Sequence, residues 1–131
     1  MQEDIKRFIK SYSELKAKKE ITDRINKFSS DSRDNKEYSL MEIKIQIIES
    51  CLKILTKDER EILYAHLIDN LKWSEIVDLK SNKNSIYSER TYKRIQKSAL
   101  SKIENFIDEN KIENYIFHSE MSHNWHVIVT F

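Results

Sequence analysis

The sequence predicts a mainly α-helical protein, a helical bundle that contains a helix-turn-helix and ends in a C-terminal β-hairpin. Apolar residues recur at three- and four-residue spacing up to about residue 110, which is the period of amphipathic helices. A short helical segment, WSEIVDL at 73–79, precedes a longer basic helix, and a helix-turn-helix needs this order. Beyond residue 111 the chain becomes rich in β-branched and aromatic residues, which is typical of strands.

Length and composition indicate one small domain. The 131 residues can bury a modest core, and the chain has neither glycine nor proline, so Asn, Asp and Ser must form its turns. Cys51 is the single cysteine, which excludes an intrachain disulfide and fits a reducing compartment. No apolar run exceeds the four residues ILYA at 62–65, so we expect neither a signal peptide nor membrane contact. The sequence therefore predicts a cytoplasmic protein.

The chain is predicted to have four parts. An N-terminal amphipathic helix covers 1–28, with its periodic apolar residues at 3–28. A polar linker covers 29–37, a helix-turn-helix domain covers 38–110, and the β-hairpin covers 111–131. The first helix either folds against the bundle or serves as a dimerisation arm, and the sequence leaves both alternatives open.

Two helices are predicted between the linker and the short helical segment. Residues 39–55 carry apolar side chains around more than half of the helix circumference, which is typical of a helix at the centre of a bundle. Thr56 and Glu59 form a capping-box pattern, in which hydroxyl and carboxylate satisfy free backbone amides at a helix start. The helix that follows, at about 57–70, is expected to place four residues inward: Ile62, Leu63, Leu67 and Leu71.

The stretch SERTYKRIQKSALSK, residues 88–102, opens the basic helix, which is predicted to run to about Asp108. Ser88 occupies the N-cap position, and Glu89 lies in the first turn, where a negative charge is favourable. At about 100° per residue, the apolar positions form one narrow stripe toward the core: Tyr92, Ile95, Ala99, Ile103 and Phe106. The opposite arc, within about 60° of Arg90, holds four cations: Arg90, Lys93, Arg94 and Lys97.

Charge is distributed unevenly along the chain. The formal net charge is +1, but residues 80–103 contain seven basic residues and one acidic residue, a sum of +6. The remaining 16 basic and 21 acidic residues sum to −5. This polarisation favours an anionic partner on one side of the molecule.

Charge and periodicity leave two interpretations of the basic helix open. In the first, it is a recognition helix, whose Arg90 and Arg94 read guanine edges in the major groove while its lysines neutralise phosphates. In the second, it is an ordinary solvated helix face. The short helix at 73–79 favours the first interpretation.

A family resemblance also favours it. The stretch LTKDEREILYAHLIDNLKWSEIVDL, followed by SERTYKRIQKSALSKI, resembles the phage ArpU and RinA type of transcriptional regulator, which is similar in pattern to the promoter-binding last domain of sigma factors. The matching positions are Glu59, Arg60, Ile62, Trp73, Glu75, Ile76, Ser88, Arg90, Thr91, Arg94, Ile95 and Leu100. The resemblance covers about residues 47–107.

The resemblance implies a helix-turn-helix protein that binds phage DNA, typically to switch on late or packaging genes. It implies that Ser88 caps the recognition helix, that Thr91 touches the DNA backbone, and that the four cations face the groove. The turn at 79–87 is longer than the family norm, so either the helix spacing differs or the loop reaches phosphates through Lys80 and Lys83. The predicted hairpin lies outside the family pattern.

Other clusters of reactive residues favour neither a metal site nor an enzyme. His118, His123 and His126 lie close together in sequence, but their spacing matches no closed zinc set. His66 is predicted to be a histidine at the edge of the core rather than a catalytic base. The sequence has no nucleophile motif and no glycine-rich phosphate loop, so it predicts neither catalysis nor a bound cofactor.

The sequence therefore predicts a sequence-specific DNA-binding transcriptional regulator of phage or mobile-element genes, with its recognition helix at about 88–107. Double-stranded DNA is the expected partner, and a homodimer is favoured because two half-sites multiply the affinity. The alternative is a phage-encoded inhibitor of a host protein, of the anti-CRISPR or antirepressor type, that keeps a helix-turn-helix for autoregulation. Such an inhibitor would bind its target through the C-terminal hairpin or the N-terminal helix.

Overall fold

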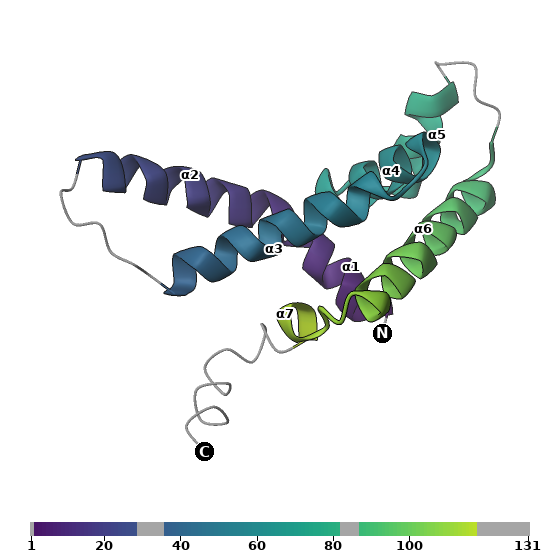
Figure 1. Cartoon of the computed structure of the whole chain (residues 1–131). Helices are drawn as coiled ribbons and strands as arrows, with labels where there is room; N and C mark the ends of the chain where they lie inside the picture. The colour runs from purple at the N-terminus through teal and green to yellow at the C-terminus, as the bar shows by residue number, and fades with distance from the viewer. Residues whose placement is uncertain (1, 29–35, 82–86, 118–131) are drawn as a thin grey trace.

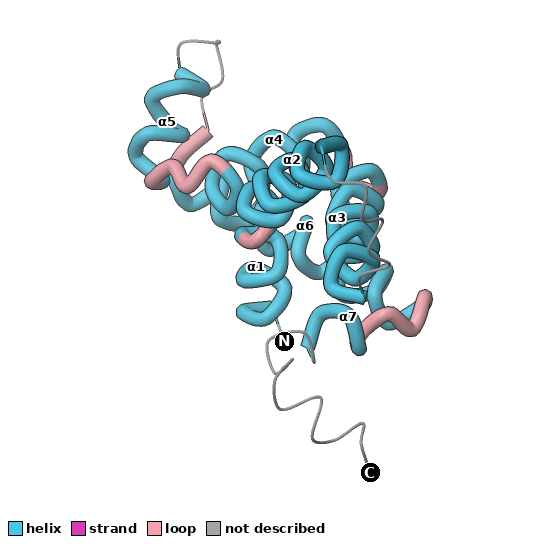
Figure 2. Tube along the Cα trace, turned by 90° about the vertical axis from the view of Figure 1, so that its left-hand side faces the viewer, coloured by secondary structure: helices cyan, strands magenta, loops and turns pink. Residues whose placement is uncertain are grey.

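The computed structural model describes residues 2–28, 36–81 and 87–117, which are mostly helical (Figure 1). The prediction of a mainly α-helical protein is confirmed, and no strand occurs within these residues. None of their helices is long and apolar enough to cross a membrane. In chain order the elements are α1 (Gln2–Lys10), α2 (Tyr12–Phe28), α3 (Lys36–Lys53), α4 (Lys57–Leu63), the π-helical turn η1 (Tyr64–Ile68), α5 (Trp73–Ser81), α6 (Glu89–Glu109) and α7 (Asn114–Phe117). Helices α5 and α7 lie at opposite ends of the molecule (Figures 1 and 2).

The single helix predicted over residues 3–28 is wrong, because the chain bends at Ser11. The Ser11 amide bonds to the carbonyls of Arg7 and Phe8, both at 3.2 Å, and its hydroxyl donates to the Phe8 carbonyl at 2.5 Å. A serine side chain that bonds back to the preceding turn competes with the regular helical bonds and bends helices. As a result α1 packs against α6, whereas α2 runs beside α3 (Figure 1).

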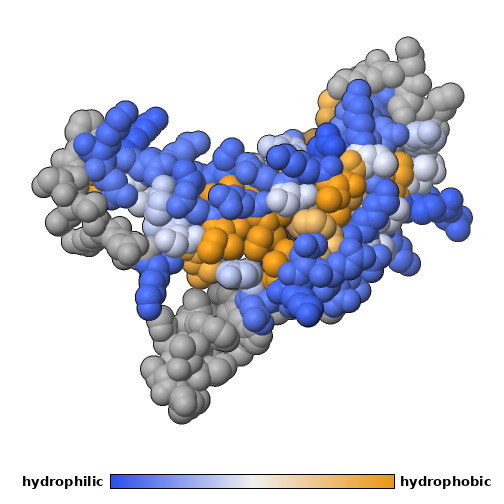
Figure 3. All heavy atoms as spheres, in the orientation of Figure 1, coloured by the Kyte–Doolittle hydropathy of each residue, from blue (hydrophilic) through white to orange (hydrophobic). Residues whose placement is uncertain are grey.

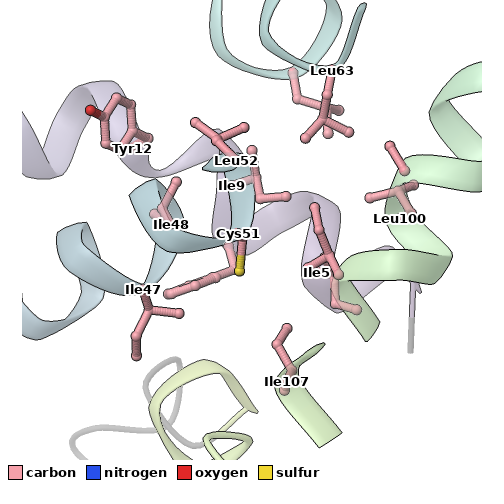
Figure 4. Close-up of a cluster of buried hydrophobic side chains, with 14 of the residues drawn as sticks. Ile5, Ile9, Tyr12, Ile47, Ile48, Cys51, Leu52, Leu63, Leu100 and Ile107 are labelled. Atoms are coloured by element: carbon pink, nitrogen blue, oxygen red, sulfur yellow. The ribbon is translucent and has the colours of Figure 1, made fainter. Parts of the chain in front are cut away.

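One apolar core joins elements from both ends of the chain. Ile5 and Ile9 of α1 have no exposed surface and belong to the same cluster as Ile48 of α3 and Ile103 of α6. Figure 4 shows Ile5, Ile9 and Ile48 close to Cys51 at the centre of this cluster. Burial raises the pKa of the Cys51 thiol to about 12, so the thiol stays protonated at neutral pH. Helix α1 is thus folded against the bundle.

A smaller apolar cluster joins α4, α5 and α6. Its buried members are Ile62, Ile76 and Tyr92, one from each helix. Trp73 and Ile95 pack against them and are partly buried. The short helix α5 is therefore held against the first half of α6.

Side chains at the α3–α4 junction satisfy the end groups of both helices. The Thr56 hydroxyl accepts a hydrogen bond from the Glu59 amide at 3.2 Å, and the Glu59 carboxylate accepts one from the Thr56 amide at 2.9 Å. The predicted capping box is confirmed. The Arg60 guanidinium donates to the carbonyl of Leu52, in the last turn of α3, at 3.0 Å and to the carbonyl of Leu55, just after that helix, at 3.1 Å.

The helix predicted over 57–70 changes to π-helical hydrogen bonding after Leu63. The Asp69 amide bonds to the Tyr64 carbonyl, five residues earlier, at 2.9 Å. Asn70 then adopts a left-handed φ of 58°. Asn tolerates this conformation better than most residues, which matters in a chain that contains no glycine.

The β-hairpin predicted over 111–131 is wrong in the part that the structure describes. Asn114–Phe117 forms the short helix α7 instead. Ile116 is 2% exposed and belongs to the main core, and Ile112 packs against that core. Ile112 precedes α7 and Ile116 lies within it, and the contact of both isoleucines with the core outweighs the β propensity of the segment. The rest of the predicted hairpin, at 118–131, lies outside the described residues.

Candidate nucleic-acid interface

Helix α6 begins where the sequence predicts. Ser88 has an extended backbone, and its hydroxyl accepts a hydrogen bond from the Thr91 amide at 3.3 Å. The Thr91 hydroxyl lies 3.2 Å from the same oxygen, so two hydroxyls meet at the start of the helix. The predicted N-cap is confirmed, and Glu89 lies in the first turn, where the helix dipole favours its charge.

Four cations lie exposed along the outer side of α6. They are Arg90, Lys93, Arg94 and Lys97, and we call them the cationic ridge. The outer surface of α6 visible in Figure 3 is largely hydrophilic. Lys93 pairs with Glu89 at 3.1 Å, but both side chains are about half exposed, so the pair contributes little. Among the residues that the structure describes, the other three cations form no ion pair, so their charges are available to a partner.

The opposite side of α6 is buried, and it is wider than the predicted stripe. Tyr92, Ala99 and Ile103 are buried as expected, but Gln96 and Leu100 are also buried, at 5% and 1% exposure. Helix α1, from the other end of the chain, packs on α6. Two apolar residues on the same side of the helix as Gln96, Leu100 and Ile107, are the sequence signal of this additional buried surface.

A buried carboxylate holds α6 in place against α4. Glu59, besides capping α4, accepts hydrogen bonds from Lys102 Nζ at 2.8 Å and from Ser98 Oγ at 3.1 Å. Burial raises the pKa of the Glu59 carboxyl, but the hydrogen bonds from Lys102, Thr56 and Ser98 together outweigh burial and lower that pKa below its ordinary value. Because these contacts join α6 to α4, they help to keep the cationic ridge facing outward.

The two loop lysines predicted to reach phosphates have different positions. Lys80, at the end of α5, donates a hydrogen bond to the Glu61 carboxylate of α4, and its side chain is only 21% exposed. Its charge is therefore used to join α5 to α4. Lys83 lies outside the described residues.

A hollow of about 360 Å³ lies beside the cationic ridge, and we call it the α1–α6 hollow. Residues of α1, η1, α5 and α6 line it: Gln2, Lys6, His66, Trp73, Lys93, Gln96, Lys97 and Leu100. The rings of His66 and Trp73 stack, with centroids 3.9 Å apart and planes 22° from parallel. His66 Nδ1 lies 3.0 Å from the Leu71 carbonyl oxygen, so in the neutral ring Nδ1 carries the proton.

The environment of His66 predicts a pH-dependent contribution to stability. Burial lowers the pKa of His66, the hydrogen bond to Leu71 opposes this with a smaller effect, and nearby Lys10 and Lys6 lower the pKa further. The unfolded chain, with its histidine pKa of about 6.5, therefore takes up the proton at a higher pH than the folded chain. The contribution of neutral His66 to the free energy of unfolding is complete above the unfolded-state pKa of about 6.5. It is lost as the pH falls from there toward the folded-state pKa.

We expect His66→Asn to flatten the decline in stability just below pH ~6.5. The asparagine amide keeps a donor for the Leu71 carbonyl but does not titrate. Urea unfolding of both proteins at a series of pH values between about 5 and 7.5 measures the difference. Parallel curves for the two proteins across this range would contradict the prediction.

Metal-binding clusters are absent from the part of the chain that the structure describes. There, no three His, Cys, Asp or Glu side chains are grouped so that they could hold a metal ion. His118, His123 and His126, which the sequence brings together, lie outside that part.

Comparison of the chain with family models, with curated proteins and with solved structures gave no match. The resemblance to the ArpU and RinA regulators therefore rests on the motifs within residues 47–107.

Proposed function

We propose that the protein is a sequence-specific DNA-binding transcriptional regulator, in which α5 and α6 form a helix-turn-helix and α6 is the recognition helix. One observation carries the proposal: the cationic ridge lies on the exposed side of a helix whose other side is buried, with a short helix packed on its first half. A recognition helix must be held by its neighbours while its side chains enter the major groove of double-stranded DNA.

Each cation of the ridge has a role in this proposal. Arg90 and Arg94 lie one helical turn apart, near the start of α6, where a guanidinium can bind O6 and N7 of a guanine in bidentate fashion. Lys93 and Lys97, one turn apart on one side of the arginines, neutralise backbone phosphates. Thr91 and the capping serine are at the helix N-terminus, where hydroxyls and free amides favour a phosphate.

The biological setting of the proposal comes from the sequence motifs. The resemblance within residues 47–107 supports a regulator of phage or mobile-element genes, acting in the cytoplasm of a bacterial host. A homodimer would bring two cationic ridges to half-sites about 34 Å apart, one turn of the duplex.

Salt dependence tests the proposed phosphate contacts. Lys97→Ala should weaken binding to all duplexes alike and reduce the slope of log Kd against log salt concentration by about 1, because one fewer counterion is released. The wild-type chain first selects a duplex from a random pool. Fluorescence anisotropy of that duplex at several salt concentrations then gives the slope for each protein.

Lys53→Ala is the matched control, because it removes one exposed lysine from the end of α3. Its slope should equal that of the wild type. The proposal fails if the wild type selects no duplex, or if the two alanine variants change the slope equally.

A second candidate function, inhibition of a host protein, is supported by a feature that DNA binding does not use. Ile21 and Ile25 lie one turn apart on α2 and are 59% and 60% exposed. Helix α2 extends with α3 to the side of the molecule away from α5 (Figure 1). An apolar pair on one helix is suited to docking in a groove of a protein partner. In this case α2 carries the inhibitory contact, and DNA binding by α6 serves autoregulation.

A further inference from the structure

We propose that helix α1 is a second DNA-contacting element, in which Lys6 and Lys10 bind backbone phosphates of the duplex that α6 reads, a step that rests on the proposed function. We call these two residues the α1 lysine pair. Helix α1 lies outside residues 47–107, which carry the family resemblance, and outside the predicted helix-turn-helix domain. The packing of α1 on α6 is what brings the pair to the DNA-binding side of the molecule (Figure 1).

The α1 lysine pair forms a short row along one side of α1. Ile5 and Ile9 fill the core and have no exposed surface. Each lysine directly follows one of these isoleucines, so both lysines lie about 100° round the helix from the core side, one turn apart. Lys10 is exposed, and the side chain of Lys6 is 31% exposed. Both ammonium groups can therefore reach a partner in solution.

Two observations place this row beside the cationic ridge. Gln2 Nε2 donates a hydrogen bond at 3.3 Å to Oγ of Ser101, which lies one turn after Lys97 on the same side of α6. Residues of both rows, Lys6 of α1 with Lys93 and Lys97 of α6, line the α1–α6 hollow. The side of α1 that carries the lysine pair therefore runs along the ridge.

The electrostatic environment of His66 supports the same arrangement. Burial is the largest cause of the lowered pKa of His66. The charges of Lys10, Lys6 and Lys93 lower that pKa further. Because salt screens charges beyond about 10 Å, cations of both helices lie around this one ring.

This arrangement of cations is unfavourable for folding alone. Like charges four residues apart destabilise a helix, and this spacing occurs both in the α1 lysine pair and between Lys93 and Lys97. Glu3 pairs with Lys6 at 3.1 Å, but its side chain is 79% exposed, so the pair contributes little and a phosphate can replace the carboxylate. Lys10 forms no ion pair within the described residues.

An extended polyanion fits these cations better than a compact anion does. They run along two neighbouring helices, and the cationic ridge alone extends over two turns of α6, about 10 Å. The phosphates of a duplex repeat along each strand, so α1 can hold one strand while α6 lies in the groove. Phosphate contacts fix the register and orientation of a protein on DNA but carry no sequence information. The α1 lysine pair should therefore add affinity for every duplex.

Salt dependence tests the α1 lysine pair. The double variant Lys6→Ala, Lys10→Ala should reduce the slope of log Kd against log salt concentration by about 2, because two fewer counterions are released. It should weaken the selected duplex and an unrelated one by the same factor. The matched control Lys18→Ala, Lys27→Ala removes two exposed lysines of α2 and should keep the wild-type slope. Equal slopes for the two double variants would overturn the proposal.

Directed cleavage of the duplex tests the position of α1. Lys10→Cys supplies a thiol that carries an iron chelate, whereas Cys51 has no exposed surface and is protected from the reagent. Hydroxyl radicals from the chelate should cut the backbone of the selected duplex. The same chelate on Lys27→Cys, in α2, should leave the duplex intact. The proposal is wrong if saturating amounts of the two labelled proteins cut the duplex equally or if neither cuts it.

The outcomes separate the role of α1 from the proposed function. If Lys97→Ala lowers the slope but the α1 double variant does not, α6 binds DNA and the proposal for α1 is wrong. If the α1 double variant lowers the slope but Lys97→Ala does not, DNA lies on α1 and α6 is not the recognition helix. If the wild type selects no duplex, both proposals fail.

Discussion

Replacing Ile103 with alanine should lower the free energy of unfolding by about 2–5 kcal/mol. Ile103 has no exposed surface and lies on α6, in the cluster that also contains Ile5 of α1 and Ile48 of α3. Truncation removes apolar contacts where three helices are joined and leaves a cavity that the neighbours fill only in part. The cationic ridge on the exposed side keeps all its side chains in this variant.

Ile21→Ala is the control for this substitution. Ile21 is 59% exposed on α2, so its truncation should change the free energy of unfolding by no more than about 0.5 kcal/mol. Urea unfolding followed by circular dichroism measures both variants. Equal losses for Ile103→Ala and Ile21→Ala would show that α6 is not packed against α1 and α3.

Removing both arginines of the cationic ridge should have the largest effect on DNA binding. Each bidentate contact between an arginine and a guanine contributes about 1–3 kcal/mol of discrimination. The double variant Arg90→Ala, Arg94→Ala should therefore lose roughly 2–6 kcal/mol of its preference for the selected duplex over an unrelated one. Because the lysines of the ridge remain, binding to unrelated duplexes should persist at a reduced level.

The matched control for the arginines is the double variant Lys18→Ala, Arg24→Ala. It removes the same formal charge from exposed positions on α2. Its preference for the selected duplex, measured by anisotropy in the same buffer, should equal that of the wild type. If the two double variants lose preference equally, or if neither loses any, α6 does not read the bases.

Local patterns were sufficient to predict most of the helices. The capping groups of Thr56, Glu59 and Ser88 act within one helical turn, so their spacing in the sequence determines their hydrogen bonds. The cationic ridge is predictable for the same reason, because the period of one helix decides which cations share a side. These predictions need no knowledge of how distant segments pack.

One local bend and two features that depend on distant contacts escaped prediction. The bend at Ser11 comes from one hydroxyl bonding to the preceding turn, and serine occurs in many unbent helices. The segment around Ile116 has the composition of a strand, yet its contact with the core makes it helical. Glu59 is recognisable as a cap, but its bonds to Ser98 and Lys102 span about forty residues of sequence.

The α1–α6 hollow could not have been found from the sequence. Lys6 and Gln96 are brought together because the apolar side of α1 packs against α6. In the sequence, Gln96 is one polar residue among many on a basic helix, and its own side chain does not mark the position as buried. Burial of a polar group without a partner is a property of packing, so only the assembled structure shows it.

Nuclear magnetic resonance on the isotope-labelled full chain tests the DNA-binding proposal most directly. The selected duplex is added stepwise, and the changes in the backbone amide signals are assigned along the sequence. We predict that the largest changes occur in the first half of α6, from Glu89 to Lys97, and that α2 around Ile21 and Ile25 is unaffected. Changes confined to α2, or no changes in α6 at saturating duplex, would contradict the proposal that α6 is the recognition helix.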